Sequence, residues 1–115
     1  GKNPLDEASL VLHQLMAVIE ERRLNPPQKS YTTKLFQGGN DLIGKKIMEE
    51  AGEVVEAADE PGDSGREHLI YEAADLLYHL MVMLGYHEIH ISEIETELGR
   101  RFGVSGIDEK ASRKS

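Results

Sequence analysis

Two clusters of acidic residues have the types and the spacing needed for metal chemistry. The first cluster is Glu49, Glu50 and Glu53, and the second is Glu72 and Asp75. On an α-helix, residues three apart lie on neighbouring turns of one face, so each cluster places two carboxylates side by side. If the two helices face each other, the clusters offer four carboxylates to one divalent cation: Glu50, Glu53, Glu72 and Asp75.

A solvated helix face is the usual alternative for an acidic run, and it fits the first cluster better than the second. Residues 69–84 are apolar in almost every direction of a helix, which is typical of a buried helix. Buried carboxylates are rare unless they are paired, hydrogen-bonded or bound to a metal. A buried salt bridge to Lys45, Lys46 or an arginine would also satisfy these charges. It would not explain the convergence of four or five acids.

The type of ligand limits the choice of ion. A site made of carboxylates, without cysteine and with histidine only at its edge, suits Mg²⁺ or Mn²⁺ better than Zn²⁺. A di-iron bundle would need Glu-x-x-His pairs, and no glutamate here is followed by histidine at that spacing. We therefore expect Mg²⁺, with Mn²⁺ as a substitute.

The composition predicts a small enzyme. The chain has 115 residues, no cysteine and a formal net charge of −8. This charge opposes binding to nucleic acid, and the sequence offers no basic amphipathic helix or long apolar run for a membrane. Without a signal-peptide pattern, the expected location is the cytoplasm. We expect one domain over residues 1–103, a mobile tail over 104–115, and a small partner bridged by metal.

Apolar residues recur at intervals of three and four and never alternate for long, which predicts an all-α fold of about five helices. Two of the helices are expected to open with capping boxes, Ser64 with Glu67 and Ser92 with Glu95. A loop is expected at residues 61–63. The expected helical ranges are 3–24, about 32–37, 41 to about 58, 64 to about 84, and 92 to near Gly103.

The fourth of these helices has more apolar directions than one small bundle can cover. We therefore expect a homodimer in which helices of both chains complete the core.

Glu-Glu-x-x-Glu followed by Glu-x-x-Asp resembles the motif of the MazG-like all-α nucleoside-triphosphate pyrophosphohydrolases. Three flanking stretches are similar to one branch of that superfamily, the phosphoribosyl-ATP pyrophosphohydrolases of histidine biosynthesis. The resemblance spans roughly residues 30–101, and the sequence departs from it at residues 85–90 and after Phe102. The flanking stretches are residues 30–35, Lys45-Lys46 and 71–80.

The resemblance implies Mg²⁺-dependent hydrolysis of the α–β phosphoanhydride of N1-(5-phosphoribosyl)-ATP to N1-(5-phosphoribosyl)-AMP and pyrophosphate. The metal also fits the charge, because it reverses the local sign of an acidic site that would otherwise repel a polyphosphate. Glu49 would activate the attacking water or hold a further ion, or else it is a solvated glutamate. By analogy with the superfamily, the metal ligands would be Glu50, Glu53, Glu72 and Asp75.

Several neighbouring residues are candidates for contacts with the substrate. Lys34 and Lys46 could hold phosphate oxygens, or they are ordinary surface lysines. The hydroxyls of Tyr31 and Thr32 could touch the phosphoribosyl group, whereas capping of a helix is the expected role of Ser30. His79 could orient Asp75 four residues earlier, or it is a satisfied core histidine.

Two other functions share the acidic clusters. A housekeeping pyrophosphatase for other nucleotides would differ in residues 30–34, and a non-catalytic helical interaction module would use the acids as a solvated surface. Some relatives are fused to the cyclohydrolase of the next step. If 115 residues are the whole protein, we expect that enzyme to be a separate chain.

Overall fold

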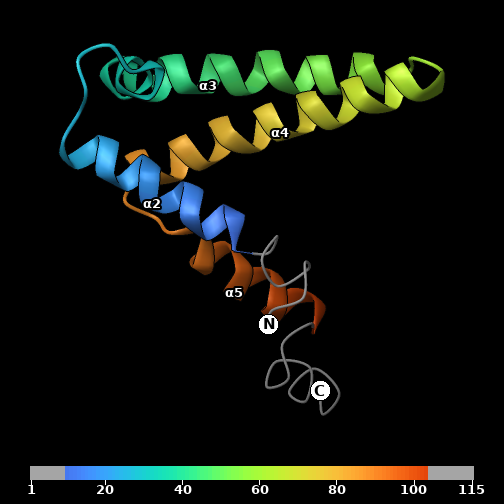
Figure 1. Cartoon of the computed structure of the whole chain (residues 1–115). Helices are drawn as coiled ribbons and strands as arrows, with labels where there is room; N and C mark the ends of the chain where they lie inside the picture. Colours follow the sequence, from blue (N-terminus) through green and yellow to red (C-terminus); the bar gives the residue numbers. More distant parts are fainter. Residues whose placement is uncertain (1–9, 104–115) are drawn as a thin grey trace, which may run out of the picture.

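The computed structural model describes residues 10–103, and these form four helices without a strand (Figure 1). The all-α prediction is confirmed. The expected helix start at residues 3–4 and the tail at 104–115 lie outside the described residues. None of the helices in the described part has the length and apolar character needed to cross a lipid bilayer. The helices are α2 (Val11–Leu24), α3 (Tyr31–Ala58), α4 (Gly62–Tyr86) and α5 (Ile91–Phe102).

Helices α3 and α4 form a long antiparallel hairpin, α2 packs against one end of it, and α5 packs mainly against α2 (Figure 1). The core lies at that end, where the amphipathic faces of all four helices meet and remove their apolar side chains from water. Its buried members are Met16, Ile19, Leu35, Ile43, Met81, Val82 and Ile91. Within residues 10–103, no further helix covers the other end of the hairpin.

Gly39 kinks α3 at the place where the sequence predicts a helix to stop. Its backbone angles are φ 64° and ψ −157°, a combination that is open almost only to glycine. Figure 1 shows the residues before the kink nearly end-on and the rest of α3 running across the view. The kink lets the chain turn directly from the core into the long segment that carries the first acidic cluster.

We expect Gly39→Ala to lower the free energy of unfolding by about 1–3 kcal/mol, because alanine is strained at this φ and ψ. Its Cβ would also lie 3.0 Å from the Tyr86 hydroxyl oxygen. Gly52→Ala is a matched control, since Gly52 is in the same helix with nothing within 4 Å of an added Cβ. The control should be unchanged or more stable by about 0.5–1 kcal/mol. Equal urea midpoints for the two variants would contradict this account of the kink.

The N-terminal caps of α4 and α5 differ from the predicted ones. Helix α4 begins at Gly62, because the Gly65 amide already donates to the carbonyl of Pro61 at 3.3 Å, so neither the Ser64 cap nor a full loop at 61–63 forms. Helix α5 is capped by His90, whose imidazole Nδ1 accepts from the Ser92 amide at 3.0 Å. The His90 amide donates to Glu93 Oε2 at 3.0 Å and completes a capping box.

The C-terminal ends of the helices agree with the sequence predictions more closely than the N-terminal caps do. Helix α2 stops at Asn25 and α5 at Gly103, which has the left-handed conformation of a helix C-terminus. Helix α4 runs to Tyr86, slightly beyond the predicted end near Leu84.

Helix α4 has exposed apolar side chains in the single chain, so its full burial, which was expected from both chains of a homodimer, stays a prediction. Helix α3 is also exposed along an apolar line, at Met48 and Val55. The exposed apolar residues of α4 include Ile70, Tyr71, Leu77 and Leu80.

Candidate metal centre

The antiparallel hairpin of α3 and α4 brings the two acidic clusters together. Ligand atoms of Glu50, Glu53 and Glu72 lie within 4.8 Å of one another, and so do ligand atoms of Glu50, Asp75 and His79. Glu50 belongs to both groups and joins them. All four carboxylates predicted as metal ligands therefore converge across the helix pair, and His79 is at the same place.

Two carboxylate oxygens in this cluster are buried without a hydrogen-bond partner. They are Oε2 of Glu50 and Oε2 of Glu72, and Glu72 is only 6% exposed. Leaving such a group unsatisfied costs about 1–3 kcal/mol, and more when the group is charged. A hard divalent cation would satisfy both oxygens, so the donor set fits Mg²⁺ or Mn²⁺.

The alternative of a buried salt bridge to a lysine is not what the structure shows. Lys46 Nζ lies 3.4 Å from Oε2 of Glu49, and Lys45 is exposed. Neither lysine forms an ion pair with a carboxylate of the convergent cluster.

The carboxyl groups of this cluster are close enough to change one another's pKa. The pKa of Glu50 is raised to about 8, first by burial, and then by hydrogen bonding with Glu53 and the charge of Asp75. The pKa of Glu72 is also raised, mainly by its hydrogen bond with Glu53 and then by burial. The pKa of Glu53 is lowered, because it accepts from both neighbours. In the absence of a cation, protons take its place between these groups.

We expect the metal-free protein to lose stability as pH rises from about 5 to about 8. Glu50 holds a proton in the fold up to about pH 8, whereas its ordinary pKa is 4.5, so folding takes up a proton across this window and is penalised as protons become scarce. A cation displaces that proton, so the rise in melting temperature on adding Mg²⁺ should grow from about pH 6 to about pH 9. Thermal unfolding in EDTA and in Mg²⁺ measures both trends. The same Mg²⁺ effect at both pH values would contradict the expectation.

His79 is almost fully buried, at 2% exposure, and its two ring nitrogens have different partners. Nδ1 lies 2.8 Å from the backbone oxygen of Asp75 and 3.6 Å from Oδ1 of that residue. A carbonyl only accepts, so Nδ1 carries the hydrogen and Nε2 accepts from the Tyr31 hydroxyl at 2.8 Å. His79 thus ties the start of α3 to the acidic turn of α4.

The other predicted site residues surround the cluster at different depths. Tyr31 is 47% exposed, and its ring lies near those of Tyr78 and His79. Thr32 is buried and its hydroxyl bonds to that of Tyr78. Ser30 caps α3, with its Oγ accepting from the Thr33 amide, as predicted.

Three predicted residues are not among the converging ligands. Glu49 is exposed, forms an ion pair with Lys46 at 3.4 Å, and belongs to neither group of converging ligand atoms. Lys34 is exposed and forms no ion pair with another described residue.

The sequence reasoning missed two contacts at the edge of the site. Nε2 of His68 lies 3.4 Å from Glu72 Oε1, and Nδ1 of the same ring lies 2.9 Å from Glu60 Oε2. His79, which was predicted to orient Asp75, has a ligand atom within 4.8 Å of those of Glu50 and Asp75.

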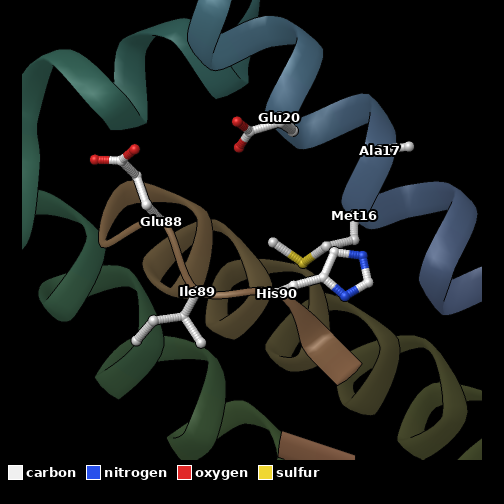
Figure 2. A pocket seen from close by; sticks show the side chains of 6 residues that line it. All are labelled: Met16, Ala17, Glu20, Glu88, Ile89 and His90. Carbon is white, nitrogen blue, oxygen red and sulfur yellow. The ribbon is translucent and has the colours of Figure 1, made fainter. Parts of the chain in front are cut away.

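A pocket of about 440 Å³ lies elsewhere, between α2 and the connection from α4 to α5 (Figure 2). None of the predicted site residues lines it. Glu20 lines it from α2, and Glu88 lines it from the connection between α4 and α5 (Figure 2). Its lining residues are Met16, Ala17, Glu20, Glu88, Ile89 and His90.

Comparison with known proteins gives one consistent family. The chain is 51% identical to a protein of Rhodopirellula baltica named "Phosphoribosyl-ATP pyrophosphatase", over 95% of this chain and 91% of that one. It is 52% identical to the protein of the same name from Geotalea daltonii, over 90% of this chain and 94% of that one.

A fused relative also matches. The chain is 52% identical to "Histidine biosynthesis bifunctional protein HisIE" of Wolinella succinogenes, over 89% of this chain and 42% of that protein. The model of the family "Phosphoribosyl-ATP pyrophosphohydrolase" matches residues 12–102, which includes both acidic clusters. With an all-α hairpin that gathers those acids at one place, the chain belongs to the phosphoribosyl-ATP pyrophosphohydrolase family.

Proposed function

We propose that this protein hydrolyses the α–β phosphoanhydride of N1-(5-phosphoribosyl)-ATP, giving N1-(5-phosphoribosyl)-AMP and pyrophosphate in histidine biosynthesis. The observation that carries the proposal is the convergence of Glu50, Glu53, Glu72 and Asp75 in a chain of this family. The names of relatives that match at about half identity over most of both chains support the substrate.

Four carboxylates are the proposed ligands of Mg²⁺, for which Mn²⁺ can substitute. The unpartnered Oε2 atoms of Glu50 and Glu72 support this assignment, because a cation would satisfy them both. When bound, the ion supplies charge neutralisation at the phosphates and makes a coordinated water more acidic. The proposed ligands are Glu50, Glu53, Glu72 and Asp75.

In the hydrolysis itself, a water oxygen forms a bond to the α-phosphorus while the bond from that phosphorus to the bridging oxygen breaks. The water must lose a proton, and we assign its acceptance to Glu49. Glu49 lies next to Glu50 in sequence, is exposed to water, and is held by Lys46 at 3.4 Å. The pyrophosphate leaves with the bridging oxygen.

The remaining candidates are assigned to positioning. Lys34 and Lys46 supply positive charge for phosphate oxygens, and the exposed part of the Tyr31 ring offers a surface to the substrate. Thr32 fixes the position of Tyr78 through the hydrogen bond between their hydroxyls. His79 orients Asp75 through the hydrogen bond to its backbone oxygen.

The reaction products test the proposal. After incubation with Mg²⁺, chromatography should show phosphoribosyl-AMP and pyrophosphate in equal amounts. Phosphoribosyl-ADP with inorganic phosphate would place the cleavage at the wrong anhydride and would overturn the assigned reaction.

A homodimer, a cytoplasmic location and a functional link to a cyclohydrolase belong to the same proposal. The fused relative supports the link to a second histidine-pathway activity. The exposed apolar residues Leu77 and Leu80 of α4 and Val55 of α3 support the dimer, because a second copy can bury them.

We expect Leu77→Glu to dissociate the dimer, because a charge at the buried centre of an interface is left unpaired. Light scattering of the wild type should give twice the mass of one chain, and the variant should give one. Arg66→Gln, an exposed position on the same helix, is the control and should remain dimeric. A monomeric wild type would contradict the expectation.

A further inference from the structure

A second pocket, of about 350 Å³, lies where α2 leads into α3. Two basic side chains line it, Arg22 and Lys29, and no carboxylate does. The whole set of lining residues is Arg22, Pro27, Lys29, Ser30 and Tyr31.

The two cations of this pocket, Arg22 and Lys29, lack an acidic partner within residues 10–103. Neither Arg22 nor Lys29 forms an ion pair with another described residue, although the sequence has 21 acidic residues against 13 basic ones. Arg23, next in the chain, shows the contrast, because it pairs with Glu20 at 2.6 Å and with Glu88 at 3.6 Å. Unpaired positive charge in a concave surface of an acidic protein favours an anionic ligand.

The pocket adjoins the candidate metal centre through one residue. Tyr31 lines the pocket, and its hydroxyl lies 2.8 Å from Nε2 of His79. His79 in turn has a ligand atom within 4.8 Å of those of Glu50 and Asp75. A ligand with two anionic parts could therefore place one at the acids with a metal ion and the other in the basic pocket without one.

We propose that this pocket binds a phosphate monoester, the 5′-phosphate of the phosphoribosyl group, and so selects phosphoribosyl-ATP over ATP. The inference rests on the proposed function. Arg22 offers planar paired donors to phosphate oxygens, and Lys29 offers a compact charge. The 350 Å³ volume is in the range of small-ligand sites. ATP has no group to fill this pocket, so its binding would use the metal centre alone.

The test compares the wild type with Arg22→Gln, Lys29→Gln and the double variant, and uses Arg66→Gln as a control that removes one exposed charge elsewhere. The first readout is binding of ribose 5-phosphate in EDTA, by titration calorimetry, so that no metal contributes. The second is the kinetics of pyrophosphate release from phosphoribosyl-ATP in Mg²⁺. Thermal unfolding of each variant checks that it folds.

Ribose 5-phosphate should bind the wild type and the Arg66→Gln control, and should bind the double variant at least about tenfold more weakly. The double variant should raise KM for phosphoribosyl-ATP by about tenfold or more with kcat within about twofold, because the contact is present in both the ground state and the transition state. Its KM for ATP, where ATP is hydrolysed at all, should not change.

Two results would overturn the inference in distinguishable ways. If the wild type is active and the double variant has the same KM and the same ribose 5-phosphate binding, the pocket does not bind the 5′-phosphate. The proposed function would then still stand. A wild type that releases no pyrophosphate from phosphoribosyl-ATP would remove the proposed function and, with it, the assignment of the pocket to this substrate.

Discussion

Glu53→Gln should reduce kcat/KM for pyrophosphate release by a factor on the order of 10²–10³, with the fold intact. The neighbouring carboxyl groups of Glu72 and Glu50 lower the pKa of Glu53, which keeps it negative at neutral pH. Glutamine keeps the size of the side chain and removes the charge that attracts a cation. The reduction should be measured at several Mg²⁺ concentrations, because weaker metal binding would be partly restored by excess Mg²⁺.

Glu56→Gln is the matched control for this prediction. Glu56 is an exposed glutamate on the same helix, close to one turn further along, and belongs to neither group of converging ligand atoms. The substitution Glu56→Gln removes the same charge from α3 and should keep kcat/KM within about twofold of the wild-type value. Equal losses in the two variants would show that general charge, and not the cluster, is responsible.

Glu72→Met should abolish activity and yet stabilise the metal-free protein. Glu72 is 6% exposed, and its Oε2 has no hydrogen-bond partner. Replacing such a carboxyl with an apolar side chain of similar volume removes the cost of burying it, about 1–3 kcal/mol. Urea unfolding in EDTA should therefore show a higher free energy for the variant.

The same variant should lose most of the stabilisation that Mg²⁺ gives to the wild type, because a ligand that binds only the folded state adds a stability that grows with the logarithm of its affinity. A less stable Glu72→Met protein in EDTA would mean that Glu72 is needed for packing. The unpartnered Oε2 of Glu72 would then not indicate a cation site.

The acidic site was predictable because its geometry is mostly local. The three-residue spacing of Glu50 with Glu53 and of Glu72 with Asp75 fixes each pair on one helix face, whatever the rest of the fold does. Because residues 69–84 are apolar in almost every direction, the sequence also indicated that the second pair lies on a buried helix. What the spacing could not give is how α3 and α4 cross, and this crossing places His79 next to Glu50 and Asp75.

The helix starts were less predictable because several groups compete for the first amides of a helix. At α4 the carbonyl of Pro61 begins the hydrogen-bond ladder before Ser64 can cap it. At α5 the imidazole of His90 serves as the acceptor in place of a serine hydroxyl. Both alternatives are chemically ordinary, and the sequence pattern alone favoured the commoner residue types.

The apolar faces raise a different problem, since a sequence does not say which surface covers them. The pattern of residues 69–84 predicted burial, and in the single chain Ile70, Leu77 and Leu80 remain exposed. The mass of the protein in solution shows whether a second copy covers these side chains or whether they stay exposed to water.

Pyrophosphate release from phosphoribosyl-ATP, measured beside ATP, dUTP and dCTP in Mg²⁺ and in EDTA, tests the central claim most directly. We predict release from phosphoribosyl-ATP in Mg²⁺, none in EDTA, and a loss of that release in Glu53→Gln. Release from dUTP or dCTP in preference to phosphoribosyl-ATP would keep the metal centre and contradict the substrate. No release from any of the four would contradict the catalytic role of the acids altogether.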